Sequence, residues 1–164
     1  MIPAKINEAL NKQMNAEMYS SYLYLAMAGW FESGNLRGFA NWMRVQAEEE
    51  MAHAMKFFDH LVDRGGTVKL TAIDAPPGKW DSPLAAFEEV YKHECKVSSL
   101  IHALADLAVV EKDHPAGVFL HWFIDEQVEE EANAELIAQK LRMIGDSRNG
   151  LLMLDHELGE RKAE

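Results

Sequence analysis

The chain has 164 residues, 48% of them hydrophobic, and a formal net charge of −11 at pH 7. This length is typical of one domain with a substantial core. The acidic balance, without a cluster of basic residues, argues against nucleic-acid binding and is compatible with the binding of cations.

Cysteine content and hydropathy narrow the class further. Cys95 is the single cysteine, so an internal disulfide and a Cys-x-x-Cys motif are both excluded. The N-terminus lacks the apolar stretch of a signal peptide. The longest uncharged run, Met18 to Phe31, has 14 residues, whereas a membrane span needs roughly 20 apolar residues. We therefore expect a soluble, cytoplasmic protein that does not contact a membrane.

Helix-breaking and capping residues divide the first half of the chain. Pro3 suits the first turn of a helix that ends at Gly34, where glycine favours a C-terminal cap. Asn35 is expected to cap a second helix, which runs to Arg64 and stops at Gly65-Gly66. These two helices are joined by a short link and therefore form a hairpin.

The second half repeats this organisation after a turn-rich segment. Asp81-Ser82-Pro83 predicts a cap followed by proline at the start of a third helix, which runs to about Val110. Asp113-His114-Pro115 begins a fourth helix that ends near Ile144-Gly145. Another short link joins this second pair.

The lengths of the links predict how the helices are arranged. Segment 65–81 is long enough to run the length of a bundle, which allows the second and third helices to lie parallel. Asp146 or Ser147 then caps a short fifth helix. No alternating strand pattern competes. We predict an all-α, single-domain protein, with a four-helix bundle over about 3–145 and a short fifth helix and tail over about 146–164.

Each long helix carries a carboxylate near the middle of its apolar stripe. Taken at steps of three and four residues, the stripes include Glu17, Glu50, Glu94 and Glu130. One such residue usually reflects a misjudged helix phase or a side chain that reaches water. The same interruption in four helices requires another explanation.

The spacing of these polar residues is repeated along the chain. Both helical hairpins show intervals of 33 and then three residues, which join Glu17, Glu50 and His53 in the first hairpin and Glu94, Gln127 and Glu130 in the second. Antiparallel hairpins of equal length place such residues at one level of the bundle. We therefore expect one polar layer inside the apolar core.

The energetics of that layer indicate a metal site. Ionised carboxylates in a low-dielectric core cost several kcal/mol each unless they are paired. The stripes offer no lysine or arginine at this level, so metal cations are the expected partners. Glutamate oxygens with one imidazole suit iron or manganese, and zinc is also tolerated. Glu50 and His53, three residues apart, can face the same ion.

The combination of these motifs resembles the prokaryotic non-haem ferritins over nearly the whole chain. The resemblance implies a ferritin-like bundle in which Glu17, Glu50 and His53 hold one iron. Its neighbour would be held by Glu50, as a bridge, together with Glu94 and Glu130. The resemblance places Gln127 beside the ligands as a hydrogen-bond donor. It also places Tyr24 beside the metals, to bind a ligand or supply an electron, whereas a core aromatic with a satisfied hydroxyl is the alternative.

A second acidic group flanks these ligands. Glu49 directly precedes Glu50 in the second helix, and Glu126, Glu129 and Glu130 share one flank of the fourth helix. Most acidic runs of this kind are solvated helix faces. By resemblance, these four residues form a third iron site that leads from the dinuclear site toward an interior cavity.

The first helix carries a hint of assembly. Its apolar residues surround the stripe on several sides, and one bundle cannot bury them all: Met18, Tyr19, Tyr22, Leu23, Leu25, Ala26 and Trp30. We therefore expect a homo-oligomer. The resemblance implies a closed cage of 24 subunits, with the fifth helix at fourfold contacts and the segment 111–121 as a candidate threefold channel.

The activity implied by the resemblance is that of a ferroxidase in iron storage and detoxification. Two Fe(II) ions per subunit would give electrons to O₂, and a ferric oxide mineral would form inside the cage. Anionic ligands fit this activity because they stabilise Fe(III) more than Fe(II).

Three alternatives compete with this interpretation. A haem-containing bacterioferritin normally has a second Glu-x-x-His pair, which Gln127 and Glu130 replace here, although Met51 is a possible haem ligand. A rubrerythrin-like peroxidase needs Cys-x-x-Cys pairs, which one cysteine excludes. A metal-free helical interaction module would gain stability if Glu17 and Glu94 became leucine. We expect iron and no haem.

The remaining histidines show no paired spacing with carboxylates on a core stripe. We therefore expect surface roles for all of them, namely His60, His93, His102, His114, His121 and His156.

Overall fold

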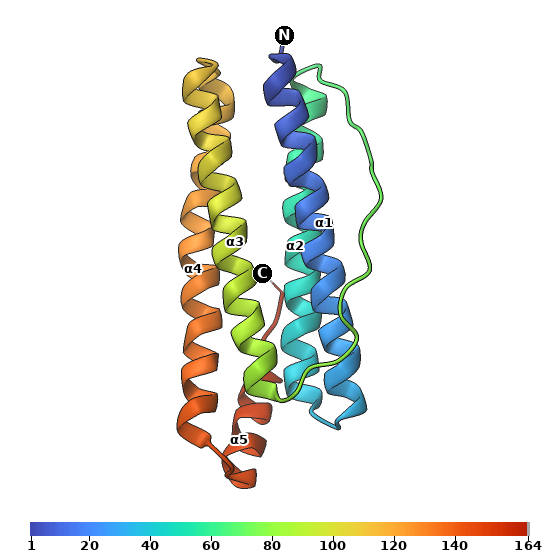
Figure 1. The fold of residues 1–164 in the computed structure, drawn as a ribbon, viewed down its shortest axis with the longest axis vertical. Helices are drawn as coiled ribbons and strands as arrows, with labels where there is room; N and C mark the ends of the chain where they lie inside the picture. The colour runs from blue at the N-terminus through green and yellow to red at the C-terminus, as the bar shows by residue number, and fades with distance from the viewer. Residues whose placement is uncertain (164) are drawn as a thin grey trace.

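The computed structural model describes residues 1–163, which form five helices and no strand (Figure 1). In chain order these are α1 (Ala4–Ser33), α2 (Arg37–Asp63), α3 (Pro83–Val110), α4 (His114–Ile144) and α5 (Arg148–Leu158). Helices α1 and α2 form one antiparallel hairpin, and α3 and α4 form the other. The crossover between Asp63 and Pro83 runs alongside α1 down the bundle, so α2 and α3 are parallel. The all-α bundle with one long crossover is confirmed.

Local capping chemistry explains where three helices begin. The hydroxyl of Ser82 accepts from the backbone N–H of Ala85 at 3.0 Å, directly before Pro83. The carboxylate of Asp113 accepts from Ala116 at 3.1 Å, and Ser147 caps α5. These side chains satisfy N–H groups that have no partner within their own helix.

The start of α2 departs from the expectation that Asn35 caps it. Leu36 is the N-cap residue and makes no side-chain cap, while Asn35 adopts a left-handed φ of 58° after Gly34, a conformation that asparagine tolerates. The cap comes instead from α5, because Oδ1 of Asp155 accepts from Gly38 at 2.8 Å and from Phe39 at 3.0 Å. The prediction for Asn35 was wrong because the capping partner lies 117 residues away from Gly38.

The core consists of two apolar clusters, one on either side of the polar layer. One contains Tyr24, Phe31, Phe39 and Phe87, and the other, toward the N-terminus of α1, includes Ile6, Leu10, Phe57 and Phe123. Every long helix passes from one cluster to the other through the residues of the predicted site. The apolar clusters therefore exclude water above and below the polar layer.

Two further features concern the surface. None of the helices described here is long and apolar enough to cross a membrane. Two large apolar side chains of α1 remain exposed on the single chain, Tyr22 at 49% and Leu25 at 55% of full exposure.

Candidate metal centre

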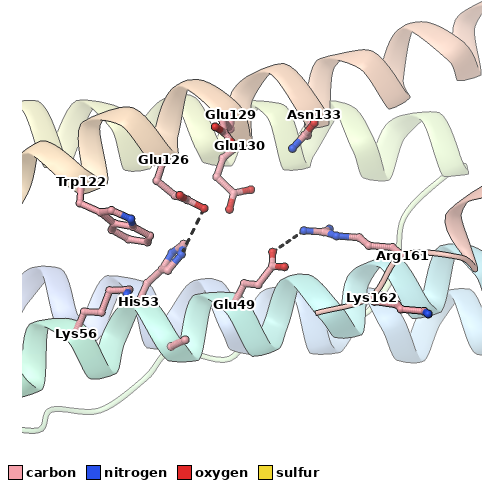
Figure 2. A pocket seen from close by; sticks show the side chains of 11 residues that line it. Glu49, His53, Lys56, Trp122, Glu126, Glu129, Glu130, Asn133, Arg161 and Lys162 are labelled. Carbon is pink, nitrogen blue, oxygen red and sulfur yellow. Dashed lines mark hydrogen bonds and ion pairs between the residues drawn. The ribbon is translucent and has the colours of Figure 1, made fainter. Parts of the chain in front are cut away.

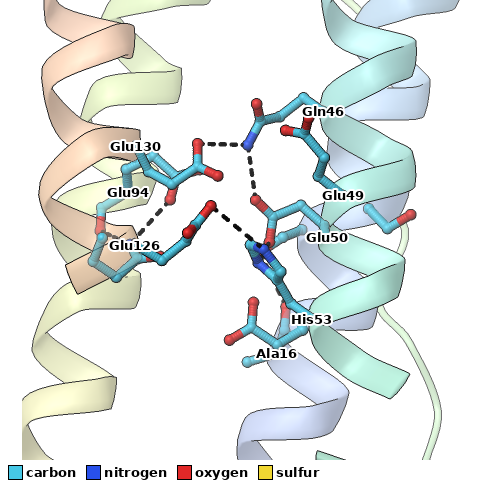
Figure 3. Close-up of polar contacts among 12 residues, drawn as sticks. Ala16, Gln46, Glu49, Glu50, His53, Glu94, Glu126 and Glu130 are labelled. Atoms are coloured by element: carbon cyan, nitrogen blue, oxygen red, sulfur yellow. Dashed lines mark hydrogen bonds and ion pairs between the residues drawn. The ribbon is translucent and has the colours of Figure 1, made fainter. Parts of the chain in front are cut away.

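Four helices bring five buried polar side chains to one level of the bundle. Glu17 comes from α1, Glu50 and His53 from α2, Glu94 from α3 and Glu130 from α4, and none is more than 5% exposed. Glu94 and Glu130 face Glu50 and His53 across the interior (Figure 3). The register of the two hairpins therefore brings together the residues that the repeated spacing predicted.

The donor atoms of these residues form two overlapping groups of a size that suits metal ions. Glu17, Glu50 and His53 form one, and Glu50, Glu94 and Glu130 form the other, with the ligand atoms of each group within 4.8 Å of one another. Glu50 belongs to both groups, as expected for a bridging carboxylate. The arrangement suits two neighbouring cations.

Two glutamines hold the carboxylates in place, and sequence reasoning did not assign them to the site. Nε2 of Gln46 donates to Glu50 at 3.0 Å and to Glu130 at 2.7 Å, which connects α2 to α4. Nε2 of Gln13 donates to Glu17 at 2.8 Å. A signal was present, because each glutamine precedes its glutamate by four residues and the two glutamines share the 33-residue spacing.

Glu94 is oriented by two further donors. The Tyr24 hydroxyl donates to Oε1 of Glu94, and Nε2 of Gln127 donates to Oε2 at 3.2 Å. Gln127 also lies 3.2 Å from the hydroxyl of Ser98. Both predicted residues therefore contact a candidate ligand. Tyr24 is fully buried, and its hydroxyl is satisfied by this contact, as expected of a core aromatic that lies beside a candidate ligand.

His93 is partly buried, so the expected surface role was wrong for this residue. Its Nε2 lies 2.7 Å from the hydroxyl of Ser20, and its ring centroid lies 6.0 Å from those of Tyr19 and Tyr24. Burial, followed by the charge of Lys96, lowers the pKa of His93 to about 4, so the ring is neutral at physiological pH. Its position directly before Glu94 in α3 turns it toward α1.

His60 is also partly buried and stacks on Phe119 with ring centroids 4.0 Å apart. The expectation of a surface role is therefore wrong for His60 as well. The other four histidines outside the site are exposed: His102, His114, His121 and His156.

Burial and mutual repulsion make the site favour either protons or cations. Burial, followed by the charges of neighbouring glutamates, raises the pKa values of Glu17 and Glu50. Burial also raises the pKa of Glu94, and burial with the charge of Glu94 raises that of Glu130 to about 8. Oε2 of Glu17 is buried without a hydrogen-bond partner among residues 1–163. A bound cation would satisfy this oxygen and displace the protons.

Comparison with known proteins decides the family. A family model described as a ferritin-like domain matches residues 7–144. The chain belongs to the ferritin family. The resemblance inferred from the glutamate and histidine spacing is confirmed.

Relatives of this ferritin match it over nearly their whole length. A protein of Bacteroides fragilis (strain 638R), named bacterial non-heme ferritin, is 46% identical over 98% of this chain and 100% of its own. A protein of the same name from Escherichia coli O6:H1 is 38% identical over 96% of each chain. The crystal structure of an open pore ferritin from Archaeoglobus fulgidus is 56% identical, with a TM-score of 0.98 over 99% of this chain and 100% of that chain.

The predicted third site of this ferritin differs from the dinuclear groups. Glu49, Glu126, Glu129 and Glu130 line one pocket beside the two overlapping ligand groups, which we call the outer pocket (Figure 2). Within the described part of the chain, however, neither Glu49 nor Glu129 belongs to a group of residues whose ligand atoms are close enough together to hold one metal ion. Oε2 of Glu49 instead pairs with Nη2 of Arg161 at 2.5 Å.

A third metal-sized group connects the two regions. It contains His53, Glu126 and Glu130, with Nε2 of His53 4.0 Å from Oε1 of Glu126. Glu130 therefore borders both the candidate dinuclear site and the outer pocket. The sequence spacing did not predict the approach of Glu126 to His53, which depends on how α4 is rotated against α2.

Proposed function

We propose that this ferritin stores and detoxifies iron by oxidising Fe(II) with O₂ at a dinuclear site within each subunit. The observation that carries the proposal is the pair of overlapping ligand groups that share Glu50. Two ions held by one bridging carboxylate are close enough to deliver two electrons to one O₂ molecule.

The ligand chemistry supports iron as the substrate. Four carboxylates and one imidazole suit Fe(II), and anionic oxygen donors favour the Fe(III) product. The residues of the chain orient these ligands: Gln46 fixes Glu50 and Glu130, while Tyr24 and Gln127 fix Glu94. Each Fe(II) ion gives one electron to O₂. We propose that Tyr24 can supply a further electron, because its hydroxyl contacts the ligand Glu94 directly.

We also propose that the ferric product collects as a hydrated oxide within a homo-oligomeric cage of 24 subunits in the cytoplasm. The exposed apolar side chains of Tyr22 and Leu25 on α1 support association between subunits. The names of the relatives from Bacteroides fragilis and Escherichia coli support storage without haem.

The test is the kinetics of iron oxidation. Metal-free protein is titrated with Fe(II) without oxygen and then mixed with air, while ferric absorbance is recorded. We expect a fast phase that saturates at two irons per chain. Substitution Glu50→Ala removes the shared ligand and should slow this phase by about 100-fold or more.

The control is Glu48→Ala, which removes an exposed carboxylate two residues earlier in α2. The fast phase should be unchanged in this variant. A fast phase that survives Glu50→Ala, or that saturates at one iron per chain, would contradict oxidation at the shared dinuclear site.

A further inference from the structure

The C-terminal tail returns to the outer pocket. After α5 ends at Leu158, the side-chain amide of Asn41 in α2 donates to the carbonyl oxygens of Leu158, Gly159 and Arg161 at 3.0–3.4 Å. These contacts hold the tail along α2, between α5 and the dinuclear site. The position of Arg161 therefore results from anchored backbone and not from the side chain alone.

The guanidinium of Arg161 occupies a defined place in the pocket. It lies 4.5 Å from the ring centroid of Trp42, a cation–π contact, and Nη1 donates to the Trp42 carbonyl at 3.5 Å. Nη2 pairs with Oε2 of Glu49 at 2.5 Å, and both side chains are only 21% exposed. Figure 2 shows the guanidinium directed at Glu49, across the pocket from Glu129 and Glu130. The planar guanidinium thus contacts an aromatic ring, a backbone carbonyl and a carboxylate at the same time.

The charge of the pocket explains why a cationic side chain is stable there. Glu49, Glu126, Glu129 and Glu130 all line it, and grouped carboxylates repel one another unless a cation lies among them. Arg161 and Lys162 are two of the basic residues at its edge. The Glu49 carboxylate can pair with the guanidinium or with a metal ion in the pocket, and the two cations compete for it.

We propose that Arg161 is a built-in competitor in the outer pocket, so that a metal cation bound there gains Glu49 as a ligand only by displacing the guanidinium. The inference rests on the proposed function, because it treats the outer pocket as the place that iron enters after or before the dinuclear site. Glu130 borders both regions, so an ion in the outer pocket repels ions in the dinuclear site. By weakening metal binding in the outer pocket, Arg161 keeps that pocket a point of passage.

The test is the binding of Zn²⁺, which undergoes no oxidation, to the assembled metal-free protein by titration calorimetry. Substitution Arg161→Gln removes the competing charge and keeps a polar side chain. We expect the first two equivalents per chain to bind as in the wild type. The next binding event should become about three- to tenfold tighter, as expected when a partly exposed ion pair no longer has to be broken.

Two further variants make the result specific. Arg142→Gln removes the same charge from an arginine that pairs with Glu88 on the exposed surface, and it should leave the third event unchanged. In the double variant Arg161→Gln/Glu49→Gln, the gain should disappear because the contested carboxylate is gone. Arg161→Lys keeps the charge and should give an affinity closer to the wild type.

The outcomes separate this inference from the proposed function. The role of Arg161 alone would be overturned if Arg161→Gln bound two Zn²⁺ equivalents tightly while its third binding event was absent or unchanged. An equal gain in Arg142→Gln would also overturn it, because the effect would then reflect net charge. If neither the wild type nor any variant bound two Zn²⁺ equivalents tightly, the dinuclear site would be contradicted. Tighter Zn²⁺ binding in Arg161→Gln would in that case still support the competition for Glu49.

Discussion

At the scale of single residues, the site is governed by the cost of burying carboxylates. Glu17, Glu50, Glu94 and Glu130 are almost inaccessible to solvent. Among residues 1–163, their hydrogen-bond donors are glutamine amides and the Tyr24 hydroxyl, and Nδ1 of His53 lies 3.4 Å from Oε2 of Glu50. Neutral donors reduce the desolvation cost but do not supply positive charge. The pKa values of these carboxyl groups are therefore raised, and the metal-free protein retains protons at this level.

This proton retention gives a pH dependence of stability. The pKa of Glu130 rises from an ordinary value of 4.5 to about 8 in the folded protein. Between these two pKa values the folded state holds a proton on Glu130 that the unfolded state has released. The contribution of this proton to the free energy of unfolding is therefore complete below pH 4.5 and is lost as the pH rises through 8. The free energy of unfolding of the wild type should therefore fall between pH 5 and pH 8. We expect Glu130→Gln to make this fall smaller by on the order of 2 kcal/mol.

Calorimetric unfolding of the metal-free protein at several pH values measures this effect. The matched control is Glu129→Gln, which alters an exposed residue of the same helix and should keep the wild-type slope of stability against pH. An identical slope for wild type and Glu130→Gln would show that Glu130 does not retain its proton.

At the scale of elements, α5 completes the bundle by capping α2. Asp155 accepts two N–H groups at the start of α2, and Gly38 permits this approach, because a Cβ there would lie 1.5 Å from the Asp155 carbonyl oxygen. The same packing directs the chain toward the outer pocket, where Arg161 binds. The fifth helix therefore links the end of the bundle to the site.

We expect Gly38→Ala to destabilise the protein by about 2 kcal/mol or more, because the new methyl group forces α5 away from α2. Gly29→Ala is the control, since a Cβ at Gly29 meets nothing within 4 Å, and alanine in a helix should instead stabilise by about 0.5–1 kcal/mol. Thermal unfolding checks both. If Gly38→Ala changed the stability no more unfavourably than Gly29→Ala does, the tight α2–α5 contact would be ruled out.

At the scale of the whole molecule, the parts predictable from sequence are those set by local chemistry and by periodicity. Ser82 and Asp113 cap helices within three residues of themselves, so their roles could be predicted. The shared level of Glu17, Glu50, Glu94 and Glu130 could be predicted because equal hairpins convert a 33-residue interval into one level of the bundle. Gln13 and Gln46 obey the same interval, yet hydrogen-bonding glutamines leave no signature of their own in one sequence.

The features that could not be predicted depend on contacts between distant parts of the chain. Asp155 and Gly38 are 117 residues apart, and Arg161 and Glu49 are 112 apart. No periodic sequence pattern marks either contact. A tail or a terminal helix can dock on a bundle in many ways, so the partner residues cannot be chosen from sequence. The partial burial of His93 and His60 likewise depends on small rotations of the helices about their axes.

The central claim is that one subunit holds two metal ions that share Glu50. Crystals of the assembled protein, loaded with Fe(II) without oxygen, test it directly through anomalous scattering at the iron edge. We predict two iron peaks per subunit, one among Glu17, Glu50 and His53 and one among Glu50, Glu94 and Glu130. A single peak in this layer, or iron confined to the outer pocket, would contradict it.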